Sequence, residues 1–288
     1  MLCEASCQVG RVAGEGGGFR IEVMAIRRSC AECMVRGAQG FCSLDGNALR
    51  GLNRIGTQVR FRERETLLAE GARPEHVYVV CEGTVKLTTS SRDGRLLLLR
   101  VAGAGDVLGL AAALKSSGYE ATAVALEECE VRVISRGDFM RFMQEFDGVA
   151  RNSAAAVAGE YGSAVLSARR LALSGSAAGK LASVLLDWGR LAAGRRVMAA
   201  RECDVGVDQA VSALASESAR GSAVMEEEDD GALRFRMPLT HEELGQMAGV
   251  SRETATRVLT QLKLERLLEV DGEMMVVRSP ERLEKLYC

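Results

Sequence analysis

The chain of 288 residues is long enough for two domains of ordinary size, and its hydrophobic content of 47% supports buried cores. Only 4% of the residues are aromatic, so these cores depend on aliphatic side chains. The formal net charge of −2 argues against a nucleic-acid binder at first sight, but an acidic run stands at 226–230 and the remainder of the chain is basic. Net charge therefore excludes no class of partner.

Membrane and secreted classes are disfavoured. No apolar run approaches the roughly 20 residues that span a bilayer, and the N-terminus lacks a basic stretch followed by an apolar one. We therefore expect a cytoplasmic protein with no membrane partner. Thiols stay reduced in that compartment, so the nine cysteines are expected to be ligands, redox sensors or buried filler rather than disulfides.

The N-terminus divides into a tail and a cysteine-containing segment. Residues 1–28 include GEGGGF and are expected to be flexible. Met24 is an alternative start of translation, in which case Cys3 and Cys7 are absent from the native protein, and its intact mass would decide. The segment 29–48 contains SCAECMVRGAQGFC, with three cysteines close together.

The next part of the chain is expected to be rich in strands. From about Leu49 to Ile134, β-branched runs alternate with Glu-Gly, Asp-Gly and Gly-Asp turn signals. Many short strands at regular spacing are typical of a jelly-roll-like β-roll. The stretch SRGDFMRFMQEF, which follows the last strand, predicts a helix.

A long helix is predicted over 148–173. Small and apolar residues recur in it at 4-3 spacing, namely Ala150, Ala154, Val157, Tyr161, Ala164, Ala168 and Leu171. This heptad-like seam favours pairing with a second copy of the helix, although packing on its own domain is the alternative. The seam is poor in Leu and Ile, so a dimer built on it alone would be weak.

The remaining chain, 174–288, is predicted to be a further domain. SGSAAGKLASVLLDWGRLAAG forms an amphipathic helix at its start. Residues at about 195–231 lose periodicity and end in the acidic run, so we expect a mobile insertion there.

The stretch LTHEELGQMAGVSRETATRVL predicts a helix-turn-helix. Thr240 and Glu243 have capping-box spacing at the start of a helix that Gly249 ends, and Ser251 is the N-cap of a second helix. Val258, Leu259 and Leu262 of the second helix are predicted to face inward. LLEVDGEMMVV behind it predicts a β-hairpin around Asp271-Gly272, which would be a wing.

The second helix carries the residue types of a recognition helix. An Arg guanidinium can bind guanine O6 and N7, and a Glu can accept from cytosine N4. Charged residues at such spacing are more often a solvated helix face, but capping, turn and wing here agree. The predicted DNA-binding residues are Ser251, Arg252, Glu253, Thr256 and Arg257.

On these motifs the chain resembles the CRP/FNR family of bacterial transcription regulators over nearly its whole length. The resemblance implies an α+β fold in which 49–147 is a cyclic-nucleotide-binding-like sensor roll, 148–173 a dimerisation helix and 174–288 a winged helix-turn-helix. It also implies a homodimer on double-stranded DNA, with RNA polymerase as partner. Because Arg252, Glu253 and Arg257 match the base-reading residues of the catabolite activator protein, a TGTGA-like inverted repeat is the expected operator.

The cyclic-nucleotide cassette of that family is incomplete here. The GDxxG turn is present as Gly105, Asp106 and Gly109, but Leu110 stands in place of the ribose-binding Glu. Ala121 and Thr122 stand in place of the Arg-Ser pair that grips the phosphate. A buried phosphate without its Arg would be costly, so cyclic AMP is not the expected effector. Lys115 and Arg100 lie off the motif position.

The resemblance also implies a role for the cysteines. The FNR branch binds a [4Fe–4S] cluster through N-terminal cysteines and one cysteine of the roll, and such clusters take four thiolates. Cys30, Cys33 and Cys42 form a C-x2-C-x8-C pattern, which is longer than the FNR spacing. The fourth ligand is Cys81 or Cys129; the latter lies three residues before the position of the FNR roll cysteine, on the opposite side of the strand.

Several alternatives stay open. Zinc also favours four thiolates, a metal-free thiol switch is conceivable, and inert cysteines, foremost Cys203 and Cys288, complete the choices. The roll could instead bind a small molecule or a cyclic nucleotide, and a signalling subunit that binds no DNA is the alternative function. An enzyme is not expected, because the only histidines, His76 and His241, have no visible nucleophile or metal partner.

Overall fold

The protein was analysed as a computed structural model that describes residues 29–30, 33, 40–204 and 231–287. The expected tail 1–28, and with it Met24, Cys3 and Cys7, lies outside these ranges, as do Cys288 and most of the expected insertion. The chain divides into two compact units, one up to Ser167 and one from Ala168 onward.

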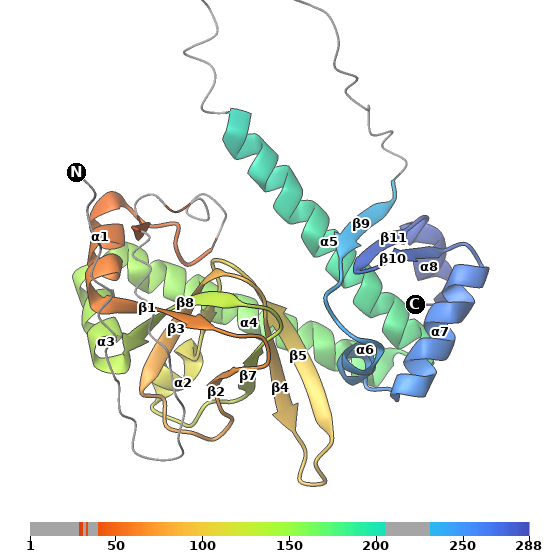
Figure 1. Ribbon diagram of the computed structural model, residues 1–288, viewed down its shortest axis with the longest axis horizontal. Coiled ribbons are helices and arrows are strands. Elements are labelled where there is room, and N and C mark those ends of the chain that lie inside the picture. The colour runs from red at the N-terminus through yellow and green to blue at the C-terminus, as the bar shows by residue number, and fades with distance from the viewer. Residues whose placement is uncertain (1–28, 31–32, 34–39, 205–230, 288) are drawn as a thin grey trace, which may run out of the picture. The chain divides into compact units, whose positions relative to one another are not determined.

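The first unit contains two antiparallel sheets of four strands, which form the predicted roll (Figure 1). One sheet has the order β1-β8-β3-β6 and the other β2-β7-β4-β5. The strands of the first sheet are β1 Gly56–Phe61, β8 Cys129–Ser135, β3 His76–Glu82 and β6 Val107–Leu108. Those of the second are β2 Thr66–Leu68, β7 Thr122–Ala125, β4 Val85–Ser90 and β5 Leu96–Ala102.

Two apolar cores lie on opposite faces of the first sheet. Tyr78, Val80 and Val131 face the second sheet and fill the interior of the roll. Val79 and Ile134 point the other way, because successive side chains of a strand alternate between faces. This outer face packs against helices α1 Gly46–Ile55, α2 Leu110–Lys115 and α3 Arg136–Glu145.

Helix α1 corrects the expectation that strands begin at Leu49. Asp45 is its N-cap and accepts hydrogen bonds from the backbone N–H groups of Asn47 and Ala48, both at 2.8 Å. Leu49 and Leu52 are buried on one face of the helix. The short amphipathic pattern gives a weak helix signal, because the first β-branched strand follows directly at Gly56.

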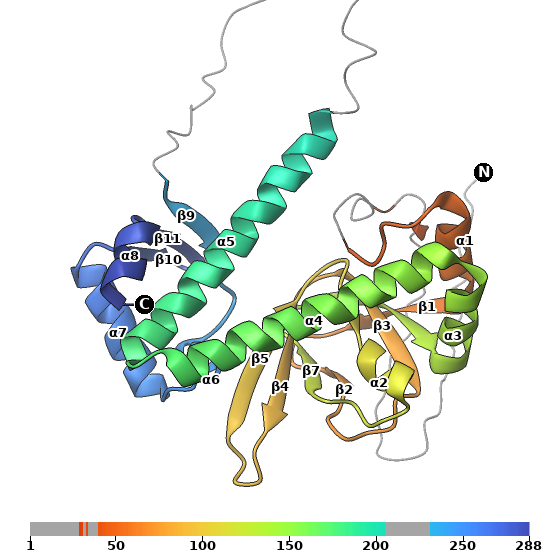
Figure 2. The ribbon, with the colours of Figure 1, turned by 180° about the vertical axis from the view of Figure 1, so that it is seen from behind.

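The predicted long helix is present as α4, Asp147–Leu173 (Figure 2). Its buried side chains include Val149 and Ser153, whereas Ala154 and Tyr161 of the predicted seam are exposed. Tyr161 has 73% of its surface exposed in the single chain. The seam is thus only partly uncovered, because Val157 packs against the core on the outer face of the first sheet.

The second unit is the predicted winged helix-turn-helix. Helix α5 Ala177–Asp204 is followed by β9 Leu233–Arg236, and by the pair α6 His241–Ala248 and α7 Arg252–Leu264. Strands β10 Leu268–Asp271 and β11 Met274–Val277 form the hairpin, β9 joins it as a third strand, and α8 Pro280–Tyr287 ends the unit. The α+β fold class and the winged helix-turn-helix are confirmed.

Helix α5 is longer than expected. The sequence was interpreted as losing structure from about 195, but the helix continues to Asp204. Residues 195–204 are mostly Arg, Ala, Met and Glu, which favour helix without supplying an apolar stripe. No helix among the described residues has the length and apolarity needed to cross a bilayer.

Candidate functional site

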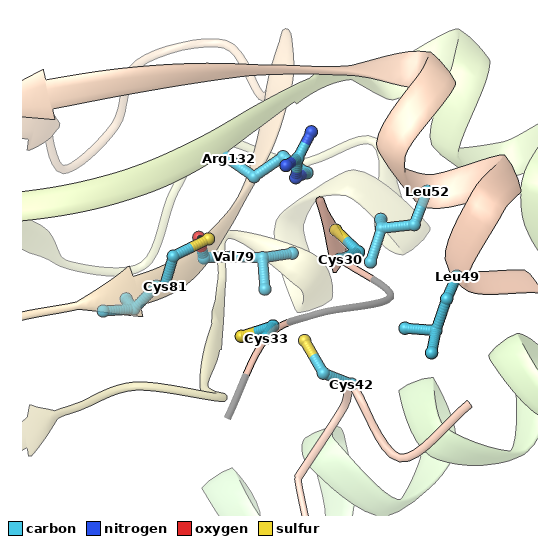
Figure 3. Close-up of a pocket in the computed structure, with 9 residues that line it drawn as sticks. Cys30, Cys33, Cys42, Leu49, Leu52, Val79, Cys81 and Arg132 are labelled. Carbon is cyan, nitrogen blue, oxygen red and sulfur yellow. The ribbon is translucent and has the colours of Figure 1, made fainter. Parts of the chain in front are cut away.

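Four cysteines from separate segments line one cavity of the first unit (Figure 3). Cys30, Cys33 and Cys42 come from the N-terminal segment, and Cys81 comes from the end of β3. Among the described residues, the other walls are apolar except for one guanidinium, and are formed by Leu49, Leu52, Val79, Val80 and Arg132.

The position of Cys81 follows from the sheet. Like Val79, it lies on the outer face of β3, next to the N-terminal segment. The pairing of β3 with β8 shifts register between Val80 and Glu82, so Cys81 is the extra residue of a β-bulge. Its thiol donates to the carbonyl of Val79 at 3.7 Å.

Cys129, the other candidate for a fourth ligand, does not reach this cavity. It is fully buried in the roll interior, on the opposite face of the same sheet. Its thiol donates to the carbonyls of Thr84 and Glu127, at 3.3 and 3.2 Å. Position 132, three residues further along β8, is on the cavity side and carries Arg132.

Arg132 donates hydrogen bonds to three neutral oxygens. Its guanidinium donates to the carbonyls of Gly56 at 3.0 Å and Asn53 at 3.4 Å, and to Asn53 Oδ1 at 3.2 Å. The same Oδ1 accepts from the backbone N–H of Cys30 at 3.4 Å. A Cβ at Gly56 would stand 2.4 Å from Cγ of Arg132, so a glycine at position 56 makes room for this side chain.

The loop around Cys42 contacts both the roll and helix α4. The backbone N–H of Phe41 donates to the carbonyl of Gly105 at 3.2 Å. The side-chain amide of Asn152, on α4, donates to the carbonyls of Phe41 at 3.0 Å and Ser43 at 2.8 Å. Cys42 therefore lies between two anchored backbone groups.

Burial controls the ionisation of the cavity thiols. Desolvation, reinforced by neighbouring thiols, raises the pKa of Cys42 to about 12. Desolvation likewise raises the pKa of Cys81 to about 11, although the positive charge of Arg132 acts to lower it. The pKa of Cys30 is raised by burial, and Arg132 opposes this by charge and by a side-chain hydrogen bond. The thiols of Cys30, Cys42 and Cys81 are thus protonated at neutral pH unless a cation replaces the protons.

The four thiols share a cavity without converging on a point. Within the described ranges, no three His, Cys, Asp or Glu side chains are close enough together to hold a single metal ion as they stand. The donor chemistry is nevertheless that of a thiolate metal centre, with four cysteines, apolar walls and a nearby cation.

The predicted effector-pocket residues make contacts within the fold of the roll. Gly105 accepts from Phe41, and Asp106 Oδ2 accepts from the backbone N–H of Gly103 at 2.9 Å. Gly109 has φ +75°, and a Cβ there would come within 2.7 Å of the Tyr119 ring. Ala121 is buried in the roll interior, and Oγ1 of Thr122 accepts from the backbone N–H of Glu70 at 3.0 Å.

Both cations that could compensate for the missing phosphate-binding Arg are paired with carboxylates. Arg100 binds Glu160 of α4 at 2.8 Å and Asp106 at 3.6 Å. Lys115 Nζ is 3.8 Å from Glu120, and its side chain is 70% exposed. A cyclic phosphate would have to displace these partners.

The recognition helix in the second unit has the predicted geometry. Thr240 and Glu243 form both halves of the capping box, and Gly249 ends α6 with φ +65°. Ser251 caps α7 by accepting from the backbone N–H of Thr254 at 3.2 Å. Val258, Leu259 and Leu262 are buried, as predicted. The predicted DNA-binding residues are all exposed at the start of α7, namely Ser251, Arg252, Glu253, Thr256 and Arg257.

One contact beside the recognition helix was not predicted. Nδ1 of His241, the first residue of α6, is 3.0 Å from Oγ1 of Thr256. Hydrogen bonds from its own backbone N–H and from Ser251 lower the pKa of Glu253, so this carboxylate is ionised and available as an acceptor. The sequence gives no signal of the contact between His241 and Thr256, because it joins two helices across the turn.

A β-roll joined to a winged helix-turn-helix defines a DNA-binding transcription regulator, and sequence comparison agrees. Residues 58–146 match the cyclic nucleotide-binding domain family, and residues 179–286 match the Crp-like helix-turn-helix domain family. The chain belongs to the CRP/FNR family, whose members are transcription regulators rather than enzymes.

Individual relatives are distant. The transcriptional activator protein FnrL of Cereibacter sphaeroides is 25% identical over 257 residues, which are 89% of this chain and 90% of FnrL. The cAMP-activated regulator CRP of Escherichia coli O6:H1 is 26% identical over 76% of this chain and 88% of its own. The solved structure of FixK2 from Bradyrhizobium japonicum has the same fold, with a TM-score of 0.61, 23% identity and coverage of 81% of this chain and 98% of FixK2.

Proposed function

We propose that this regulator is controlled through a [4Fe–4S] cluster held by Cys30, Cys33, Cys42 and Cys81. The observation that carries the proposal is the meeting of four cysteines from separate segments at one cavity. Four thiolates are the usual ligand set of such a cluster. When bound, the cluster would supply a redox-sensitive, oxygen-labile centre.

Zinc is the alternative occupant, and the spacing of the thiols disfavours it. A tetrahedral zinc with Zn–S distances of roughly 2.3 Å holds its sulfurs about 4 Å apart around one point. In a four-iron cluster each thiolate binds a different iron, so the ligands surround a larger body. Thiols that share a cavity without converging on a point suit the second arrangement.

Other inputs have less support. A metal-free thiol switch needs a reactive thiolate, and the raised pKa values of Cys42 and Cys81 work against it. Cyclic AMP has less support because the described residues offer its phosphate no available cationic partner at the motif position. Ala121 and Thr122 carry no charge, and Arg100 is paired with Glu160. We therefore expect no rise in melting temperature with cyclic AMP, and a clear rise would favour the nucleotide instead.

At the output end, the proposal is a homodimer on a TGTGA-like inverted repeat. Arg252, Glu253 and Arg257 are exposed where a recognition helix reads base edges. The apolar face of α4 that includes Ala154 and Tyr161 is uncovered and suits pairing with a second copy. RNA polymerase would be the partner once the dimer is on DNA.

The link between input and output runs through the N-terminal segment. Cys42 lies between Phe41 and Ser43, whose carbonyls accept hydrogen bonds from Asn152 of α4. A ligand bound at Cys42 would hold this loop against the helix. Occupancy would then bias how α4 presents its exposed face, and with it dimerisation and DNA affinity.

The test is purification of the full chain without oxygen. Iron and acid-labile sulfide at about four each per protomer, with broad visible absorption that bleaches in air, are expected. Binding to a TGTGA inverted repeat should weaken after bleaching. Stoichiometric zinc without sulfide would overturn the cluster, and unchanged operator binding after bleaching would overturn the control mechanism.

A further inference from the structure

Among the described residues, one charged side chain lines the cavity, and its buried position is unusual for a cation. Arg132 is 4% exposed and lines the same cavity as the four cysteines (Figure 3). It lies on the outer face of β8, opposite Val79 of β3 in the register of the sheet. Burying a guanidinium is costly unless its surroundings stabilise the charge.

Hydrogen bonds fix the orientation of the Arg132 guanidinium. Asn53 and Gly56 accept its N–H groups through neutral oxygens, and Gly56 lacks the Cβ that would displace it. The guanidinium therefore has a fixed orientation beside the thiol of Cys30.

We propose that Arg132 is a positioning residue that compensates the negative charge of a thiolate-bound metal centre in this cavity. Four thiolates around a metal or cluster leave a net negative charge in an apolar recess, and a fixed cation offsets the cost of burying it. Arg132 thereby stabilises the loaded state relative to the empty one. Asn53 supports this role, because its Oδ1 accepts from both Arg132 and the backbone of Cys30.

This inference rests on the proposed function, and its test separates the two. Wild type, Arg132→Gln and Arg132→Lys are loaded without oxygen with ferrous iron and sulfide, and in a parallel arm with zinc. The rate of metal loss to an excess of chelator is then measured anaerobically. Arg60→Gln is the matched control, because it makes the same change on the neighbouring strand at a residue that does not line the cavity.

Arg132→Gln is expected to lose metal about 10-fold faster than wild type, or more, as for other residues that support metal ligands. Arg132→Lys keeps the charge and should remain within about threefold of wild type, and Arg60→Gln should match wild type. Equal rates for Arg132→Gln and wild type would overturn the inference while leaving the metal centre intact. A lysine variant as fast as the glutamine variant would overturn the charge account.

Circular dichroism of the metal-free proteins identifies variants that fail to fold. If Arg132→Gln is among them, Asn53→Ala tests the same point with the cation retained but no longer oriented. It is expected to lose metal faster than wild type, and an unchanged rate would overturn the inference. A wild-type protein that binds neither iron with sulfide nor zinc would overturn both this inference and the proposed cluster.

Discussion

The side-chain amide of Asn152 donates to the carbonyl of Ser43 at 2.8 Å, which ties helix α4 to the loop that carries Cys42. A second bond from the same amide to Phe41 makes this a two-point attachment. Each such bond contributes about 1 kcal/mol. In the proposed control mechanism, these two hydrogen bonds would transmit a change at Cys42 to helix α4.

Replacing Asn152 should uncouple the output from the input. In Asn152→Ala we expect normal iron and sulfide content but similar dimer fractions in the loaded and bleached states, because the loop can no longer bias the helix. Sedimentation velocity of both states measures this. Arg151→Ala, an exposed neighbour on the same helix, is the control. A variant that still changes its dimer fraction on bleaching would rule out this route.

The two candidate fourth ligands should behave differently. Cys81→Ser is expected to lose the visible absorption of the loaded protein, because it removes a thiol from the cavity. Cys129→Ala should keep it and only lower thermal stability, because its thiol lies in the roll interior. Anaerobic absorption spectra with iron analysis compare them. Loss of absorption in Cys129→Ala, with retention in Cys81→Ser, would reverse the assignment.

Operator binding should depend on the start of α7. Arg252→Ala and Arg257→Ala each remove a potential bidentate base contact, worth about 1–3 kcal/mol or roughly 5- to 150-fold in affinity. Fluorescence anisotropy with a TGTGA inverted repeat measures the loss. Lys285→Ala on α8 removes the same charge elsewhere in this unit and should have little effect. Equal losses in all three would point to a general charge effect rather than base recognition.

The turn of the helix-turn-helix should be sensitive to Gly249. This residue has φ +65°, and a Cβ there would lie 2.6 Å from Cδ2 of Leu171. Gly249→Ala is therefore expected to cost about 1–2 kcal/mol for the left-handed backbone, and more for the close contact. Gly272→Ala, at φ +56° with open space around it, incurs only the first cost. Equal falls in melting temperature would show that Leu171 moves aside freely.

Cys42 and Cys81 should react slowly in metal-free protein. With the pKa of Cys42 at about 12 and that of Cys81 at about 11, little thiolate exists at pH 8. Alkylation by iodoacetamide should be at least about 100-fold slower than for free cysteine. Because these folded-state pKa values are raised, the thiols' contribution to stability is present below about pH 9 and is lost as the pH rises toward 11. Rapid alkylation at pH 8, measured by mass spectrometry, would support a metal-free thiol switch.

The features that could be predicted from the sequence are mostly local. Thr240 with Glu243, Gly249 and Ser251 carry capping signals within a few residues, so both helices of the DNA-binding motif were placed correctly. The burial of Val258, Leu259 and Leu262 follows from helical periodicity. Helix α1 was missed, because its apolar face is short and a strand follows at once.

The cysteine cavity was only partly predictable. The three N-terminal cysteines were chosen by spacing, and alternation along β8 correctly suggested that Cys129 faces the other way. The choice of Cys81 needed the pairing of β3 with β8, which joins residues far apart in the chain. Arg132 gave no signal at all, because its place at the cavity depends on Asn53 and Gly56.

The pairing of β3 with β8 has a consequence for comparing such regulators. Adjacent strands are only about 4.8 Å apart, so one spot on the face of a sheet is reachable from either strand. The residue that reaches such a position can therefore come from either of two neighbouring strands while the sheet stays the same. Position 132 on β8 and Cys81 on β3 are an example, because both line the same cavity. What such proteins would share is then a place on a surface rather than a column of aligned residues.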